Sequence, residues 1–218
     1  MRTHPVFLRL EGRRCVIIGG DAAAAAKASA CRRAGGSVVV IAPALDAASA
    51  AAVAEGGITH LARAYRARDL AGAFLAYAST RDPEVIGRLA AEADREGVLL
   101  NVIDVPEACS FVSPAVLERG ELVVAVGTGG ASPGLAARLR SELASHVGPE
   151  YGPFLEILGA VRRRLGGDPA RGDIMSALLA SPLLELVRHG RRDDIDALLG
   201  RVAGFDLDRL GVALGGSA

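Results

Sequence analysis

Three short segments of this sequence contain residue types that can bind a phosphate or move a proton. Gly19-Gly20-Asp21 follows an apolar run, Asp104 ends another apolar run, and the glycine-rich segment 127–130 precedes Ser132. A glycine turn between a strand and a helix lets backbone N–H groups approach a phosphate. A carboxylate at the end of a strand can accept a proton in catalysis when partial burial raises its pKa. The sequence therefore indicates a nucleotide site and a proton acceptor.

The glycine turn matches the dinucleotide-binding fingerprint G-x-G-x-x-G/A at two of its three defining positions. Gly19 and Ala24 fit the first and third positions, whereas the second is Asp21, whose carboxylate would repel the phosphates. The next apolar run ends at Ala42-Pro43 and lacks the acidic residue that commonly binds the adenosine ribose. The turn is compatible with cofactor binding and with a purely structural role.

The other two segments also leave alternatives open. Asp104 stands two residues before Pro106, so it could be a cap or turn residue instead of a general base. The segment Gly127-Thr128-Gly129-Gly130 could be an anion-binding nest before the helix that Ser132-Pro133 predicts, or a plain tight turn. For both segments, the choice between the two alternatives depends on which residues surround them in the folded chain.

Alternating apolar strands and helices would position the first two segments at one edge of a sheet. We predict strands at 14–18, 38–41, 58–60, 74–78 and 98–103, and helices at 22–34, 45–55, 67–72 and 83–96. Strand, glycine turn, helix and strand within about 30 residues is one βαβ unit. The pattern predicts an α/β fold with a Rossmann-type doubly wound parallel sheet over residues 1–113.

The pattern changes after Phe111. Residues 115–117 and 122–126 flank Arg119-Gly120 and predict a β-hairpin, and Ser132-Pro133 begins a helix. From there apolar residues recur at helical spacing, for instance Leu155, Leu158 and Val161. We predict a hairpin-and-helix segment at 114–144 and a small helical domain at 145–218.

Composition excludes several other classes of protein. The net charge is zero and there are only eight Phe and Tyr residues, so we expect no nucleic-acid partner. The three cysteines form no CxxC pair, and His4, His60, His146 and His189 show no metal-ligand spacing. There is no P-loop and no Tyr-x-x-x-Lys pair. We find no secretory signal and no apolar run of about 18 residues, so we expect a cytoplasmic protein without membrane contact.

Taken together, the segments resemble one family, the siroheme synthase N-terminal module, which comprises precorrin-2 dehydrogenases and sirohydrochlorin ferrochelatases. The specific match is Asn101-Val-Ile-Asp-Val-Pro-Glu-Ala-Cys-Ser-Phe-Val-Ser-Pro114, followed by Arg119-Gly-Glu-Leu-Val-Val-Ala-Val-Gly-Thr-Gly-Gly-Ala-Ser-Pro-Gly-Leu-Ala136, and the match needs no insertion or deletion. The opening Pro5-Val-Phe-Leu-Arg-Leu10, then Val16-Ile-Ile-Gly-Gly20 and Lys27, is also similar. The resemblance fades after about residue 166.

The resemblance implies an activity, a cofactor and partners. Family members oxidise precorrin-2 to sirohydrochlorin with NAD, and some insert ferrous iron as a second substrate to give siroheme. The family forms homodimers through the hairpin and the following helix, which makes 114–144 a dimerisation segment. A methyltransferase module found in fused members is not expected in this chain.

The resemblance also implies roles for individual residues. Asp104 would be the catalytic residue for dehydrogenation and for any chelation. The residues implied in cofactor binding are Gly19, Gly20, Asp21, Ala22, Ala42, Pro43 and Thr80. Those implied in binding the tetrapyrrole, which carries eight carboxylates, are Ser110, Arg119, Thr128, Gly129, Gly130 and Ser132, with Arg138 and Arg140 as further cations.

Two departures from the family pattern fall in the cofactor half. Asp21 replaces the third of three consecutive glycines, and Arg81 and Ile86 stand where the family tends to have aspartate and asparagine. These departures bear on NAD affinity and on its selectivity over NADP. The alternative to an NAD-dependent dehydrogenase is therefore a sirohydrochlorin chelatase or tetrapyrrole-binding protein with weakened or lost NAD binding. A regulatory protein that responds to nicotinamide nucleotides is a third hypothesis, but such a sensor would not need the whole block at 101–136.

Overall fold

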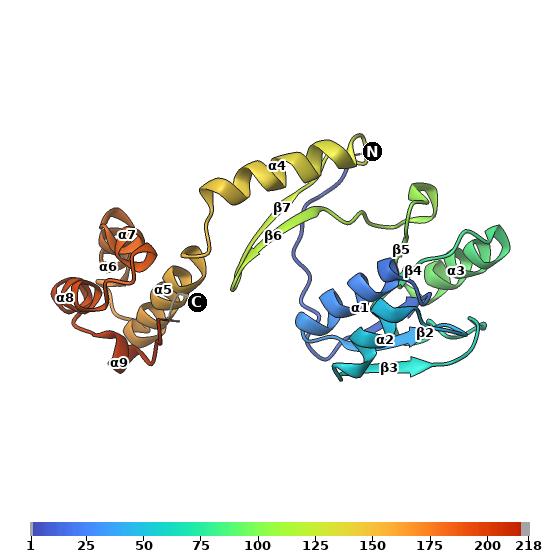
Figure 1. Ribbon diagram of the computed structural model, residues 1–218, viewed down its shortest axis with the longest axis horizontal. Helices are drawn as coiled ribbons and strands as arrows, with labels where there is room; N and C mark the ends of the chain where they lie inside the picture. The colour runs from blue at the N-terminus through green and yellow to red at the C-terminus, as the bar shows by residue number, and fades with distance from the viewer. Residues whose placement is uncertain (1, 215–218) are drawn as a thin grey trace. The chain divides into compact units, whose positions relative to one another are not determined.

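A computed structural model describes residues 2–214, and the chain divides into two compact units (Figure 1). The first unit contains the residues up to Ser113 together with Gly129–Ala131. The second contains Pro114–Thr128 and the residues from Ser132 onward. The predicted division into 1–113, 114–144 and 145–218 stays a prediction.

The first unit is built on a parallel sheet of five strands. These are β1 (Arg14–Ile18), β2 (Ser37–Ile41), β3 (Ile58–Leu61), β4 (Leu75–Ala78) and β5 (Leu99–Val102). Their spatial order is β3-β2-β1-β4-β5, and every pairing is parallel. The order reverses between β1 and β4, so the topological switch point lies at the carboxyl ends of these two strands. The predicted Rossmann-type α/β fold is confirmed.

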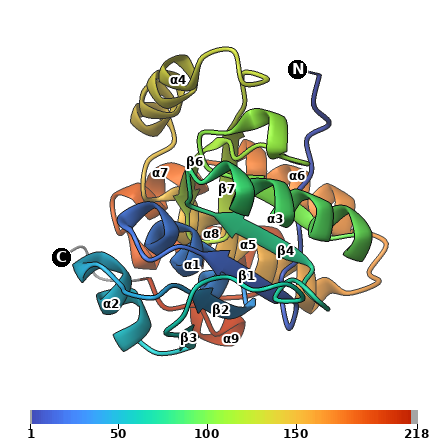
Figure 2. The same ribbon diagram turned by 90° about the vertical axis from the view of Figure 1, so that its right-hand side faces the viewer.

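Alternate residues of the strands face two different apolar layers. Cys15 and Ile17 pack with α1 (Ala22–Arg33) and α2 (Ala47–Ala54), whereas Val16 and Ile18 pack with α3 (Pro83–Glu96). This alternation follows from the period of two along a strand. Figure 2 shows α3 and α2 on opposite sides of the strands. The sheet is therefore covered on both faces, and its carboxyl edge is left for a ligand.

Capping residues fix where the helices of this unit begin. Asp21 accepts the N–H of Ala24 at 2.9 Å at the start of α1. Asp82 accepts the N–H of Glu84, and Pro83 follows at the first helical position of α3, as the sequence predicts. These short-range signals set the turns that follow β1 and β4.

The predicted helix at 67–72 is wrong, because these residues form consecutive turns. Arg68 adopts a left-handed conformation with φ 74°. The N–H groups of Arg68 and Leu70 donate to the carboxylate of Glu92 on α3, at 3.0 and 2.8 Å. A left-handed residue interrupts an α-helix, so the segment stays irregular, and the two bonds to Glu92 tie it to α3.

The second unit begins with an antiparallel hairpin of β6 (Ala115–Arg119) and β7 (Leu122–Val126). The helix α4 (Pro133–His146), capped by Ser132, packs against the hairpin and buries Leu117 and Ala136. The remaining helices are α5 (Tyr151–Leu165), α6 (Arg171–Ala180), α7 (Leu183–Arg188), α8 (Arg192–Ala203) and α9 (Leu207–Leu210). They enclose a core of their own that includes Ile157, Leu183 and Leu199, and the predicted helical character of this part is confirmed.

Candidate functional site

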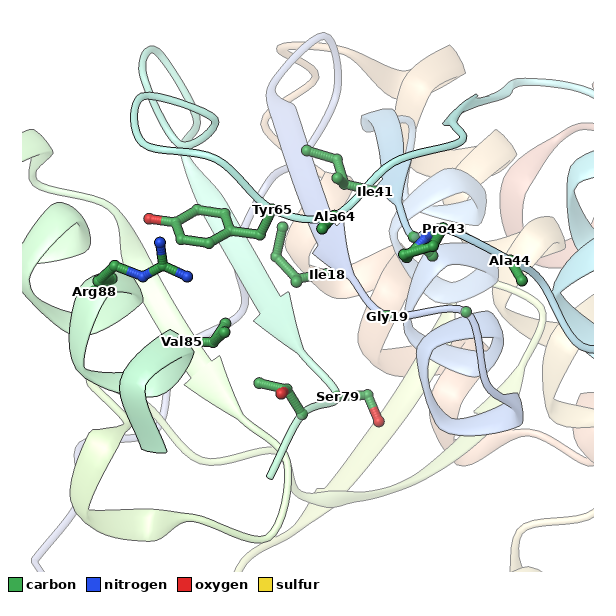
Figure 3. Close-up of a pocket in the computed structure, with 13 residues that line it drawn as sticks. Ile18, Gly19, Ile41, Pro43, Ala44, Ala64, Tyr65, Ser79, Val85 and Arg88 are labelled. Carbon is green, nitrogen blue, oxygen red and sulfur yellow. The ribbon is translucent and has the colours of Figure 1, made fainter. Parts of the chain in front are cut away.

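A cavity of about 250 Å³ lies at the carboxyl edge of the first sheet (Figure 3). It opens beside the switch point, where ligands of doubly wound folds bind. Its walls come from the ends of β1, β2 and β4, the segment after β3 and the first turns of α3. The lining residues are Ile18, Gly19, Gly20, Ile41, Ala42, Pro43, Ala44, Ala64, Tyr65, Ser79, Thr80, Val85 and Arg88. Five of the residues predicted to bind a cofactor are brought together here: Gly19, Gly20, Ala42, Pro43 and Thr80.

The two glycines let three loops approach one another at this edge. Gly19 has φ 124°, a conformation that favours glycine, and a Cβ there would lie 2.9 Å from the carbonyl oxygen of Ser79. A Cβ on Gly20 would lie 2.1 Å from the carbonyl oxygen of Ala44. Only a backbone without side chains fits between the loops after β2 and β4, so both glycines are required by the geometry of the cavity wall.

Asp21 does not line the cavity but holds the first turn of α1 to the end of β4. Its Oδ1 accepts the N–H of Ala24, and its Oδ2 accepts the hydroxyl of Ser79 at 2.5 Å. Partial burial raises the pKa of Asp21, but the hydrogen bonds from Ser79 and from backbone N–H groups outweigh it and leave the pKa below its usual value. An ionised carboxylate therefore occupies part of the helix start, next to Ala22, where a phosphate would otherwise bind.

Tyr65 and Arg88 form the wall opposite the glycines, and Figure 3 shows their side chains pointing toward one another. The guanidinium of Arg88 lies 5.6 Å from the centre of the Tyr65 ring. The Tyr65 hydroxyl donates to Glu92 at 2.6 Å, and burial together with this carboxylate raises the pKa of Tyr65. Tyr65 thus remains a neutral donor, and the wall is fixed to α3 through Glu92.

Asp104 lies on the same edge, as the second residue after the end of β5. Its backbone is left-handed with φ 63°, a conformation that aspartate tolerates better than most residues. The side chain is 69% exposed, and Arg81 Nη2 contacts its Oδ2 at 3.4 Å. Asp104 caps no helix, and the partial burial that sequence reasoning required of a general base is not met. The carboxylate is instead accessible and paired with a cation.

The residues predicted to bind the tetrapyrrole are distributed over both units. In the first unit the Ser110 hydroxyl bonds to both backbone groups of Leu100, and Gly129 and Gly130 have φ 60° and 83°. In the second unit Arg119 donates to the carbonyl of Val147, and Thr128 and Ser132 bond to each other around the start of α4. Their assignment to substrate stays a prediction.

Sequence reasoning did not select Ser79, Tyr65 or Arg88. Ser79 follows β4 just as Gly19 follows β1, so its place at the carboxyl edge of the sheet was a usable signal. Tyr65 and Arg88 gave no such signal, because the guanidinium meets the ring directly although the two residues lie 23 positions apart in the chain.

The lining of the cavity fits one part of a dinucleotide. Its volume lies below the range of about 300–1,000 Å³ that is typical of pockets for complete small ligands. Its walls are mainly apolar, and Arg88 is the one charged residue among those that line it. An adenosine moiety suits such walls, and the glycine turn at the edge leaves the rest of a dinucleotide to extend along the carboxyl ends of β1 and β4.

Fold and site together define a Rossmann-type nucleotide-binding protein. Residues 6–115 match the family described as putative NAD(P)-binding, and the chain belongs to this family. It is 35% identical over 199 residues to a siroheme synthase of Azotobacter vinelandii and 40% identical over 197 residues to one of Methylobacillus flagellatus. These matches cover 89% and 88% of this chain but only 43% and 42% of the relatives, so the chain spans less than half of their length.

A solved structure shares the fold. SirC, a precorrin-2 dehydrogenase, matches with a TM-score of 0.76 at 22% identity, and the match covers 93% of this chain and all of SirC. The resemblance to the siroheme synthase N-terminal module family is confirmed by these comparisons.

Two negative findings apply to residues 2–214. In that range no group of three or more His, Cys, Asp or Glu side chains is placed to hold a metal ion. Nor does any of the helices described there have the length and apolar character needed to cross a membrane.

Proposed function

We propose that this protein oxidises precorrin-2 to sirohydrochlorin with NAD as the electron acceptor. The observation that carries this proposal is the carboxyl edge of the first sheet, which bears both the glycine-walled cavity and the accessible carboxylate of Asp104. The identities of 35% and 40% to siroheme synthases support the substrate class. Gly19, Gly20, Ala42, Pro43 and Thr80 would hold the cofactor, with Asp21 and Ala22 at the start of α1.

The oxidation removes two hydrogens from the substrate as a hydride and a proton. NAD, when bound, supplies the hydride acceptor. Asp104 accepts the proton, directly or through a water molecule, and its exposure lets it pass that proton to solvent after each turnover. Asp104 combines a left-handed backbone with a side chain that is 69% exposed and paired only loosely, at 3.4 Å, with Arg81.

The variant Asp104→Asn tests the proposal with little change in structure. Asparagine also tolerates the left-handed conformation, so the backbone should be kept while the proton acceptor is lost. We expect the rate of precorrin-2 oxidation to fall by about 100-fold or more, and Asp104→Ala to behave similarly. Circular dichroism and thermal melting serve as controls for the fold. Turnover by either variant at the wild-type rate would remove Asp104 from catalysis.

A second candidate is a sirohydrochlorin chelatase or tetrapyrrole-binding protein with weakened NAD binding. The specific observation in its favour is the carboxylate of Asp21 at the start of α1, held by Ser79. Ferrous iron would then be the second substrate. Titration of NAD against the protein separates the two candidates, because micromolar affinity supports the dehydrogenase and no binding supports the alternative.

We further propose that a second copy of the chain covers the hairpin and α4, which makes 114–144 a dimerisation segment apart from the helical domain at 145–218. Val116 and Val123 are exposed on the hairpin, and Leu135, Leu139 and Leu143 form an exposed stripe on α4 at a spacing of four residues. Light scattering should give the mass of a dimer, and Leu139→Glu should shift it toward a monomer.

Three free cysteines are consistent with a reducing compartment, the cytoplasm.

A further inference from the structure

Arg81 is a cation at the carboxyl edge whose hydrogen-bonding capacity is almost unused. It follows Thr80, which lines the cavity, and its side chain is 87% exposed. Its contact with Asp104 at 3.4 Å engages one of the five N–H donors that a guanidinium carries. Among residues 2–214, no other hydrogen bond or ion pair involves Arg81. Four donors are therefore free to bind a ligand.

This ion pair does little to hold the fold together. Exposed ion pairs contribute little to stability, and the two loops that this pair joins are already fixed by backbone hydrogen bonds. Ser79 N–H donates to the carbonyl of Ile18, and Ile103 N–H donates to that of Ala78. A role in stability consequently does not account for an arginine at this position.

The chemistry of the pair matches a ligand rich in carboxylates. A guanidinium binds a carboxylate through two parallel hydrogen bonds, and Arg81 presents free donors for such a pair. The carboxylate of Asp104 by itself repels an anionic substrate from the place where it must accept a proton. Arg81, which stands beside it, offsets that charge.

We propose that Arg81 binds a carboxylate side chain of the tetrapyrrole and offsets the repulsion between this substrate and Asp104. The inference rests on the proposed function and adds a residue that selects an anionic substrate at the reacting end of the site. It predicts that Arg81 governs tetrapyrrole affinity and leaves coenzyme affinity unchanged.

Sirohydrochlorin titrated against the protein and followed by absorbance provides the test. Arg81→Ala should raise the Kd about tenfold or more, and Arg81→Lys, which keeps the charge but not the paired donors, should fall between it and the wild type. Arg95→Ala is the matched control, because Arg95 is an exposed arginine near the end of α3 that pairs with Glu96. The Kd of this variant for sirohydrochlorin should stay within about twofold of the wild-type value.

The double variant Arg81→Ala/Asp104→Asn separates substrate electrostatics from a structural effect. Removal of the carboxylate as well should restore part of the affinity that Arg81→Ala loses, whereas a misfolded loop would not be rescued. The octamethyl ester of sirohydrochlorin should bind the wild type and Arg81→Ala equally, because it carries no carboxylate.

The outcomes distinguish this inference from the function on which it rests. If wild-type protein binds sirohydrochlorin and Arg81→Ala binds it equally well, the inference is overturned and the proposed function stands. If wild-type protein neither binds sirohydrochlorin nor oxidises precorrin-2, both are overturned. NAD titration of each variant should give the wild-type Kd, and a parallel loss of NAD binding would also contradict the specific role of Arg81.

Discussion

The two ends of one sheet edge differ in burial and in charge. Beside β2 and the segment after β3, the edge is enclosed by Ile41, Ala42 and Tyr65, and burial and hydrogen bonds fix each wall. Beside β4 and β5, the edge carries Arg81 and Asp104, both exposed and joined by a single contact. An enclosed apolar end suits a cofactor that is held in one orientation, and an open charged end suits a reaction that exchanges protons with water. The difference indicates that the enclosed end serves to hold the cofactor and the open end serves to exchange protons.

The largest effect on the enclosed end should follow from loss of Glu92. Glu92→Ala leaves the N–H groups of Arg68 and Leu70 and the hydroxyl of Tyr65 without their buried acceptor. We expect the free energy of unfolding to fall by about 3 kcal/mol, with weaker coenzyme binding because the Tyr65 wall loosens. Urea unfolding and NAD titration measure the two effects. Glu96→Ala, the same change one turn later at a surface pair, should cost less than about 1 kcal/mol. Equal costs for the two variants would contradict the role of Glu92.

A smaller effect is expected when the glycine wall is filled. In Gly20→Ala the new Cβ would meet the carbonyl oxygen of Ala44 at 2.1 Å, so the backbone must shift. We expect a loss of about 1–3 kcal/mol in stability and a clear loss of coenzyme affinity. Gly87→Ala is the matched control, because a Cβ there has open space on a helix and should stabilise by about 0.5–1 kcal/mol. Unchanged NAD binding by Gly20→Ala would show that this wall does not form the coenzyme site.

The smallest effect concerns the charge of Asp21. Asn also caps helices well, so Asp21→Asn should keep the bond to Ala24 while it removes the negative charge. We expect NAD affinity to rise about fivefold, which is the equivalent of about 1 kcal/mol for two charges about 4 Å apart in water. Asp206→Asn, at the cap of α9 in the other unit, should leave the affinity unchanged. Weaker NAD binding by Asp21→Asn would mean that the carboxylate assists the coenzyme.

The lowered pKa of Asp21 determines how its contribution to stability and to NAD binding responds to pH. The pKa of folded Asp21 is lowered, so its contribution to stability is complete above the unfolded value of about 3.9 and is lost as the pH falls through the folded pKa. Asp21 is therefore ionised at every pH from about 6 to 8. The ratio of NAD affinities between Asp21→Asn and wild type should be constant over that range. A ratio that changes with pH would assign the effect to another group.

Local signals predicted most of the fold. The continuous apolar runs of the strands, the caps at Asp82 and Ser132, and Pro83 and Pro133 after them each depend on neighbours within a few residues. They give the parallel sheet and the position of Gly19, Gly20 and Asp104 on one edge, whereas the strand order and the switch point came from the structure.

The parts that the sequence did not reveal depend on side chains far apart in the chain. Ser79 lies 58 residues from Asp21, Arg81 lies 23 residues from Asp104, and Glu92 lies 24 residues from Arg68. No periodicity marks such pairs. The helix predicted at 67–72 is wrong because Arg68 is left-handed, and the carboxylate of Glu92 that binds this segment lies 24 residues from Arg68 in the chain.

In the proposed reaction, two electrons pass from a tetrapyrrole to NAD at the carboxyl edge of the first sheet. Freshly generated precorrin-2, mixed anaerobically with the wild-type protein, should convert to the absorbance spectrum of sirohydrochlorin only when NAD is added. One NADH should appear for each precorrin-2 that is consumed. Conversion at the same rate without NAD, or no conversion by folded protein with intact substrate and saturating NAD, would contradict the claim.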